Sequence, residues 1–146
     1  ENSPFRVVFF LLKMWYNDIT IIAQVIDLST MHISVAKNAK KEVQKRCHGG
    51  KGEIVFRELF KETDFNSSLE FLHETQVLSN SSIGYHKHKG NEEVYYIVQG
   101  EGLMIVDGKK QVVHKGDAVI THSGSAHGLI NTQSRPLTIL VFEAKY

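Results

Sequence analysis

Three histidines and one glutamate in a fixed order are the residues of this chain with the clearest chemistry. His86 and His88 are two positions apart, Glu93 follows five residues after the second of them, and His127 comes later in the chain. On a β-strand, His86 and His88 would point to the same side, because successive side chains alternate between the two faces. Three imidazoles and a carboxylate in one pocket suit a borderline divalent transition metal. The pattern therefore predicts metal-centred chemistry before any substrate is considered.

The other histidines and the single cysteine receive ordinary structural interpretations. A lone histidine on a strand is more often a hydrogen-bonded polar residue than a ligand, and we apply this reading to His32, His48, His73 and His114. One cysteine, Cys47, cannot form an internal disulfide, so a disulfide-stabilised secreted scaffold is excluded, and we interpret its thiol as buried.

The elements that must position the four residues are short strands. A strand is expected to begin at His86, and Asp107-Gly108 is a strong signal for a two-residue hairpin turn. Only residues 35–46 have a helix-like composition, and the signal there is weak. The remaining β-rich segments, separated by Gly, Asn and Ser turns, are residues 53–59, 69–78, 93–99, 103–106, 111–113, 118–120, 127–131 and 137–142. Strands at this spacing predict an all-β sandwich or barrel.

Alternation within these strands selects the residues that would line a pocket. Glu93, Tyr95 and Ile97 share one face of their strand, and His127 shares a face with Leu129. A few polar donors among apolar neighbours are typical of a small-ligand site. The substrate-pocket candidates beside the four donors are therefore Tyr95, Ile97 and Leu129.

Two further pocket candidates have competing explanations. His122 either caps a loop, which we favour, or carries protons near the pocket. Arg57 could hold a carboxylate substrate, although a surface ion pair is the more common role. Glu92 competes with Glu93 as a donor and is expected to face outward.

Composition limits the kinds of partner. The chain has 146 residues, enough for one domain with its own core, and a formal net charge of +1. Nothing in this balance favours nucleic acid, which requires a strongly basic face. The apolar runs near the beginning are shorter than the roughly 20 residues of a membrane span and do not resemble a signal peptide, so we expect a cytoplasmic protein with no membrane partner.

Residues 1–30 are expected to be an extension. A natural polar start lies near Met31, which predicts an N-terminal segment of residues 1–30 and a single domain of residues 31–146. Alternatively, residues 1–30 add strands or an interfacial helix that buries apolar surface against a second subunit.

Two motifs resemble those of the cupin superfamily. The first is Gly84-Tyr85-His86-Lys87-His88 with Glu93 and Gly100, and the second is Gly116-Asp117 with His122, Gly124, His127 and Asn131. The resemblance covers roughly residues 50–143. The sequence departs from the family pattern in two places: His122 stands where the family usually has proline, and the first glycine is closer to the histidine pair than is common.

The resemblance implies a fold, a ligand set and a cofactor. The fold would be a double-stranded β-helix, the jelly-roll barrel of cupins, with the N-terminal extension. His86, His88, Glu93 and His127 would hold one divalent transition metal (Mn, Fe, Ni, Cu or Zn) and leave coordination positions open, as in catalytic rather than structural sites. Since small jelly rolls have sheet edges and apolar outer faces that need covering, we expect a homodimer.

The function classes that remain differ in whether there is turnover. The first is a metal-dependent enzyme (a dioxygenase, decarboxylase, isomerase or lyase) acting on a small carboxylate, enediol or sugar, in which no residue is identified as catalytic. The second is a metal-containing sensor or carrier that binds a small ligand without turnover. The third is a scaffold in which the metal only stabilises the fold.

Overall fold

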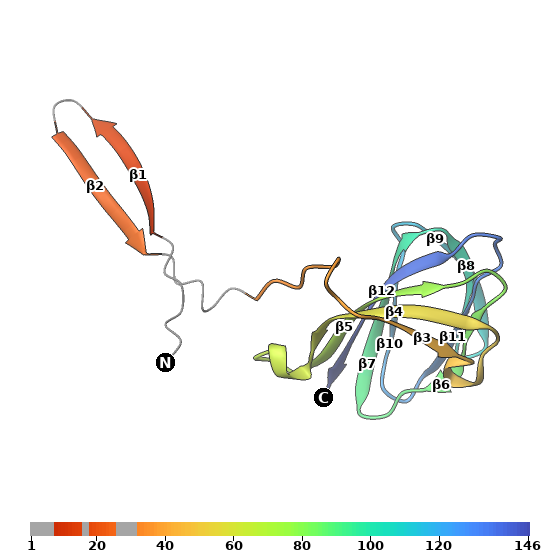
Figure 1. The fold of residues 1–146 in the computed structure, drawn as a ribbon. Coiled ribbons are helices and arrows are strands. Elements are labelled where there is room, and N and C mark those ends of the chain that lie inside the picture. The colour runs from red at the N-terminus through yellow and green to blue at the C-terminus, as the bar shows by residue number, and fades with distance from the viewer. Residues whose placement is uncertain (1–7, 16–17, 26–31) are drawn as a thin grey trace. The chain divides into compact units, whose positions relative to one another are not determined.

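The computed structural model describes residues 8–15, 18–25 and 32–146, which fall into two compact units, residues 1–33 and 34–146 (Figure 1). In the first unit, β1 (Val8–Trp15) and β2 (Asp18–Val25) pair as an antiparallel hairpin. The segment therefore contains strands, and the alternative that they bury apolar surface against a second subunit stays a prediction. The expected domain start at Met31 lies outside the described residues, so that boundary stays a prediction.

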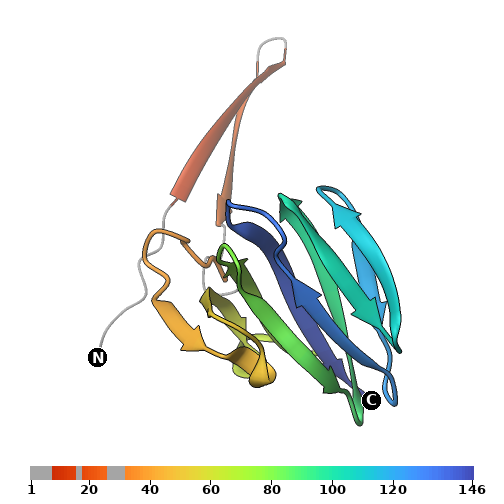
Figure 2. The ribbon, with the colours of Figure 1, turned by 90° about the vertical axis from the view of Figure 1, so that its right-hand side faces the viewer.

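The second unit is a barrel of two antiparallel sheets, seen from the side in Figure 2. A six-stranded sheet has the order β10-β7-β12-β5-β4-β3, and a four-stranded sheet has the order β6-β11-β8-β9. The strands are β3 (Lys41–Lys45), β4 (Glu53–Lys61), β5 (Leu69–Val77), β6 (Ser82–Lys87), β7 (Asn91–Gln99), β8 (Glu101–Val106), β9 (Lys109–His114), β10 (Ala118–Thr121), β11 (Ala126–Ile130) and β12 (Leu137–Lys145). Two 3-10 turns, η2 (Cys47–Gly49) and η3 (Glu62–Asp64), flank β4. The prediction of an all-β jelly-roll barrel is confirmed.

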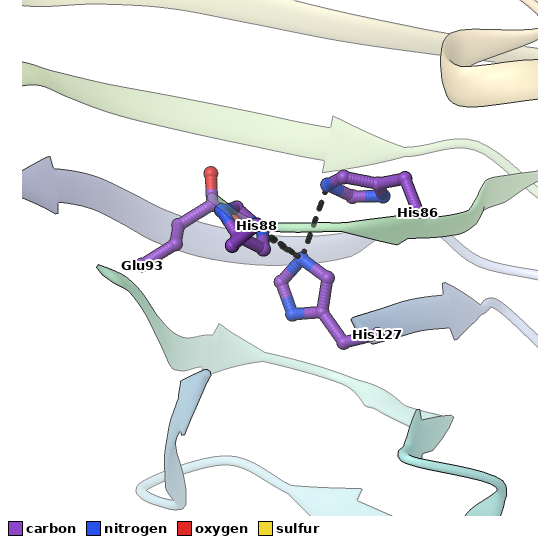
Figure 3. Close-up of side chains that lie close together, drawn as sticks. All are labelled: His86, His88, Glu93 and His127. Carbon is purple, nitrogen blue, oxygen red and sulfur yellow. Dashed lines mark hydrogen bonds and ion pairs between the residues drawn. The ribbon is translucent and has the colours of Figure 1, made fainter. Parts of the chain in front are cut away.

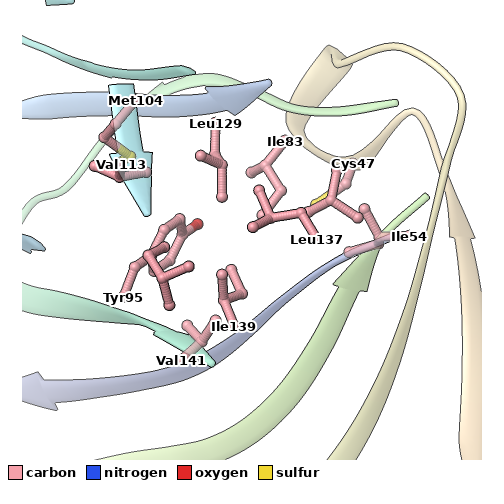
Figure 4. Close-up of a cluster of buried hydrophobic side chains, with 12 residues drawn as sticks. Cys47, Ile54, Ile83, Tyr95, Met104, Val113, Leu129, Leu137, Ile139 and Val141 are labelled. Carbon is pink, nitrogen blue, oxygen red and sulfur yellow. The ribbon is translucent and has the colours of Figure 1, made fainter. Parts of the chain in front are cut away.

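The inner faces of the two sheets meet in one apolar core (Figure 4). Ile97 and Ile139 of the larger sheet and Leu129 and Met104 of the smaller sheet are almost completely buried. Burial alternates along β7, where Glu93, Tyr95 and Ile97 are inside and Tyr96 is exposed, as predicted. The alternation of side chains along β7 therefore places the polar Glu93 and the apolar Ile97 on the same inner face of the barrel.

The hairpin predicted at Asp107-Gly108 is confirmed. Both residues have positive φ angles, 46° and 76°, and they join β8 to β9. Two consecutive positive φ values match the right-handed twist of the flanking strands, which explains the Asp-Gly pair.

The helix-like reading of residues 35–46 is wrong. Residues 41–45 form β3, an edge strand that pairs with β4, with Val43 opposite Val55. All five side chains of β3 are exposed, which gives the segment its polar, helix-like composition. Hydrogen bonding to a neighbouring strand overrides such a weak local preference. Among the residues that the structure describes, no helix is long and apolar enough to cross a membrane.

The strand expected to begin at His86 instead begins at Ser82 and ends at Lys87, as β6. His88 follows the strand and is held by backbone hydrogen bonds: its N–H donates to Ser125 O at 3.0 Å, and Gly124 N–H donates to its carbonyl at 2.9 Å. The loop before β11 therefore fixes the second histidine.

Candidate metal centre

Three strands and one loop bring the four predicted donor residues together. His86 in β6 lies directly opposite His127 in β11, Glu93 points inward from β7, and His88 follows β6. One nitrogen or oxygen of each residue lies within 4.8 Å of the corresponding atoms of the others (Figure 3). Residues more than thirty positions apart thus converge on one point inside the barrel.

The spacing of these atoms fits a metal ion. His127 Nε2 lies 3.2 Å from His88 Nε2, 3.3 Å from His86 Nε2 and 3.0 Å from Glu93 Oε2. Ligands about 2.1 Å from a common ion are about 3.0 Å apart at right angles and about 3.4 Å apart in a tetrahedron. The four groups could therefore bind one divalent ion with little rearrangement.

Hydrogen bonds on the far side of each ring orient the imidazoles. His86 Nδ1 lies 2.9 Å from Gly84 O, and His88 Nδ1 lies 3.2 Å from Glu143 Oε2. The Gly84 carbonyl only accepts, and so does Asn91 Oδ1, which lies 3.3 Å from His88 Nδ1. Both Nδ1 atoms therefore donate, and each Nε2 keeps its lone pair toward the centre. His127 Nδ1 lies 2.7 Å from the Thr121 hydroxyl. Such outer partners fix the tautomer and the ring orientation of metal-binding histidines.

Burial makes this cluster unusual without a cation. His88, His127 and Glu93 are 5%, 1% and 7% exposed, and Glu93 Oε2 has no hydrogen-bond partner within the described part of the chain. A buried carboxylate oxygen facing imidazole lone pairs is costly unless a proton or a metal ion lies between them. The orphaned oxygen thus fits a metal site.

Burial also shifts the pKa values of groups around the centre. Desolvation lowers the pKa of His86 to about 4, so its imidazole is neutral at neutral pH, as a ligand must be. Burial, the adjacent Glu70 carboxyl and the charge of Glu93 raise the pKa of Glu143 to about 7. Burial and the charge of Glu93 raise the pKa of Tyr95 above its usual range, which keeps the phenol neutral.

Of the five pocket candidates, Tyr95 lies against the centre, with its ring centroid 4.7 Å from that of His127. Ile97 and Leu129 are fully buried in the apolar core and do not line the cavities beside the centre.

The two polar candidates lie elsewhere. His122 is exposed, and its Nδ1 is 2.9 Å from Glu92 Oε2, so this pair lies outside the cavities at the centre. Arg57 pairs with Glu74 at 3.0 Å, which agrees with the ion-pair role expected for it.

The sequence interpretation missed His48. Its ring stacks on the ring of His86, with centroids 3.7 Å apart and planes inclined by 8°. This contact depends on a close approach of two backbones, since a Cβ on Gly84 would overlap the carbonyl oxygen of His48 and a Cβ on Gly50 would overlap that of Ser82. No spacing rule connects a turn at residue 48 with a strand at residue 86. The only signal for His48 in the sequence was that it is a histidine with no assigned role.

Two cavities adjoin the centre, and three residues, His48, Phe71 and Glu93, line both. The outer cavity, about 430 Å³, is polar and includes His86, His88, Glu143 and the exposed Lys87 and Lys89. The inner cavity, about 190 Å³, is lined from β3, η2, β4, β5, β6, β7 and β12. Its lining combines apolar core side chains with the polar Gln44, His48, His73, Thr75 and Glu93, of which Gln44 and His48 are exposed. The centre is therefore accessible to a small molecule.

Known proteins with similar sequences and folds agree with this architecture. The cupin domain model matches residues 74–143. The chain is 35% identical over 92 residues, 63% of its length, to the oxalate-binding protein of Thermotoga maritima, of which it covers 76%. It is 36% identical over 86 residues, 59% of its length, to an uncharacterized protein of Methanocaldococcus jannaschii, of which it covers 69%.

A solved structure extends the similarity to the whole barrel. The structure of a predicted oxalate decarboxylase from Thermotoga maritima superimposes with a TM-score of 0.76 at 29% identity, covering 80% of this chain and all of the other. The barrel, the converging histidines and glutamate, and these relatives together lead to one conclusion: this chain belongs to the cupin family.

Proposed function

We propose that the chain binds one divalent transition metal through His86, His88, Glu93 and His127 and, through that metal, a small oxygen-rich molecule such as a carboxylate. The observation that carries this proposal is the convergence of four inward-facing donors around an orphaned, buried carboxylate oxygen. Four protein ligands leave one or two coordination positions for a substrate oxygen, where the ion supplies Lewis-acid polarisation.

The chain's own residues define how a ligand would be received. The outer cavity has Lys87 and Lys89 at its exposed surface beside the carboxyl groups of Glu93 and Glu143, so two ammonium groups are available to pair with an anion bound at the metal. His48 covers one face of the His86 ring and is itself exposed, which leaves its ring nitrogens available for hydrogen bonds to a bound anion. The name of the similar oxalate-binding protein supports a small carboxylate as the first ligand to test.

Turnover is the question that separates an enzyme from a binding protein. We favour an enzyme because the four-donor set leaves open coordination positions beside an accessible cavity. A non-catalytic carrier or sensor is the alternative, since among the described residues that line the outer cavity only Glu143 and His48 join the four donors as carboxyl or imidazole groups.

Elemental analysis and calorimetry test the proposal. Protein purified without added metal should contain close to one transition-metal ion per chain, and oxalate should bind the metal-loaded but not the chelator-treated protein. His88→Ala should remove both metal and oxalate binding, whereas His114→Ala, at an exposed histidine of β9, should retain both. Full metal content in His88→Ala would refute the ligand set. Recovery of the ligand unchanged, by NMR after prolonged incubation, would favour the carrier.

Assembly and location are further parts of the proposal. Tyr96 of β7 and Ile120 of β10 are exposed on the outer face of the larger sheet, which supports a homodimer. We place the protein in the cytoplasm, with no nucleic-acid or membrane partner. Sedimentation of the full chain as a monomer at micromolar concentration would refute the dimer.

A further inference from the structure

The inner cavity differs in chemistry from the outer one that it adjoins. Its volume of about 190 Å³ is below the roughly 300–1,000 Å³ typical of sites for drug-sized ligands. Five of its lining side chains, Cys47, Ile54, Ile83, Tyr95 and Val141, are core residues drawn in Figure 4. The ionisable groups among them are uncharged, since burial and the charge of Glu93 raise the pKa of Cys47 to about 11. Gln44, His48, His73, Thr75 and Glu93 also line the cavity, and a charged group placed among the five core side chains would lose its hydration there.

Phe71 marks the border between the two cavities. It lines both, is partly buried, and stacks on His73 with ring centroids 4.3 Å apart. Glu93 also lines both, so the inner cavity begins at the metal centre itself. A molecule longer than a two-carbon acid that coordinates a metal at Glu93 can therefore place its remaining carbons past Phe71, against the core side chains of the inner cavity.

We propose that the natural ligand is a chelating acid or enediol with a short apolar tail, whose oxygen-rich head lies at the metal and whose tail fills the inner cavity. This inference rests on the proposed function, because the head requires the metal. The cavity holds about six groups of water-like size, at roughly 30 Å³ each. The tail is therefore limited to a few carbon atoms, and oxalate, which has none, would leave the cavity unfilled.

A homologous ligand series tests the tail. Calorimetry with manganese-loaded protein would compare oxalate with straight-chain 2-oxo acids from three to nine carbons. Each methylene that enters the cavity should tighten binding up to about fourfold, and the gain should stop after about four to six methylenes. 2-Oxoglutarate, which has a charged tail, should bind more weakly than 2-oxopentanoate, which has the same number of carbons.

Matched variants locate the effect. Val141→Phe fills the inner cavity and should abolish the gain with chain length while leaving the affinity for oxalate within about twofold. Val112→Phe introduces the same residue at an exposed position of β9 and should change neither. Phe71→Ala enlarges the inner cavity and should extend the series to longer tails, which keeps the test decisive if Val141→Phe does not fold.

The outcomes separate the two proposals. Tightening with chain length that Val141→Phe removes, or that Phe71→Ala extends, supports the apolar tail. If oxalate and pyruvate bind but longer 2-oxo acids bind no more tightly, the proposal of an apolar tail is refuted and the proposed function stands. If neither oxalate nor any 2-oxo acid binds the metal-loaded protein, both the carboxylate ligand and the tail fall.

Discussion

Glu93→Gln should stabilise the metal-free protein while removing its response to metal. Glu93 is 7% exposed, and its Oε2 lies 3.0 Å from His127 Nε2 and 3.5 Å from His88 Nε2 with no hydrogen bond in the described residues. An unsatisfied buried acceptor costs about 1–3 kcal/mol. A glutamine amide can donate to a histidine lone pair, so we expect a gain of about 1–2 kcal/mol.

Thermal unfolding in chelator, and again in excess metal, measures both effects. For a chain of this size, about 1 kcal/mol corresponds to about 4 °C, so metal-free Glu93→Gln should melt about 4–8 °C above wild type. Free metal at 100 times its dissociation constant stabilises wild type by about 2.7 kcal/mol, or roughly 10 °C, and this shift should be largely lost in the variant.

Glu92→Gln is the matched control. Glu92 precedes Glu93 but accepts hydrogen bonds from His122 and the Tyr146 hydroxyl outside the centre. Its variant should keep the full metal response. A metal-free Glu93→Gln that melts lower than wild type and still responds to metal would show that a protonated imidazole holds Glu93 in place, and the reasoning about an orphaned acceptor would then be wrong.

Three further predictions concern two groups beside the centre, Glu143 and His86, and one buried amide away from it, Asn131. Glu143→Gln weakens the acceptor for His88 Nδ1 and should reduce metal affinity about 10- to 100-fold in a chelator competition, whereas an unchanged affinity would exclude an orienting role. Burial places the pKa of His86 in the folded state below its ordinary value of 6.5, at about 4, so its contribution to stability is complete above pH 6.5 and is lost as the pH falls toward 4. Urea unfolding of metal-free protein should show this loss in wild type and a smaller one in His86→Gln, which does not titrate. Asn131 is 2% exposed and donates to the carbonyl oxygens of Val77, Leu78 and Arg135, so Asn131→Ala should lower the free energy of unfolding by about 2–4 kcal/mol, and a loss below 1 kcal/mol would contradict this.

Local patterns were sufficient to predict much of the barrel. The alternation of Glu93, Tyr95 and Ile97 and the Asp107-Gly108 turn follow from the geometry of single strands and turns, which depends on neighbouring residues. The metal-binding motif is likewise readable because its members keep fixed distances in sequence. Residues 41–45 were misread because an edge strand with five exposed side chains has no inward-facing pattern of its own.

Only the tertiary structure could identify the groups that surround the centre. His48 reaches His86 from a turn 38 positions earlier in the chain, through a contact between two glycine-containing backbones, and Glu143 reaches His88 because β12 pairs with β7, placing Glu143 opposite Glu93. Such contacts join segments with no periodic relation. The sequence by itself determined the donors and the β-strands that carry them, because these are encoded by local spacing. The orientation of the imidazoles, the orphaned carboxylate oxygen and the inner cavity were decided by the packing of two sheets, which no local pattern records.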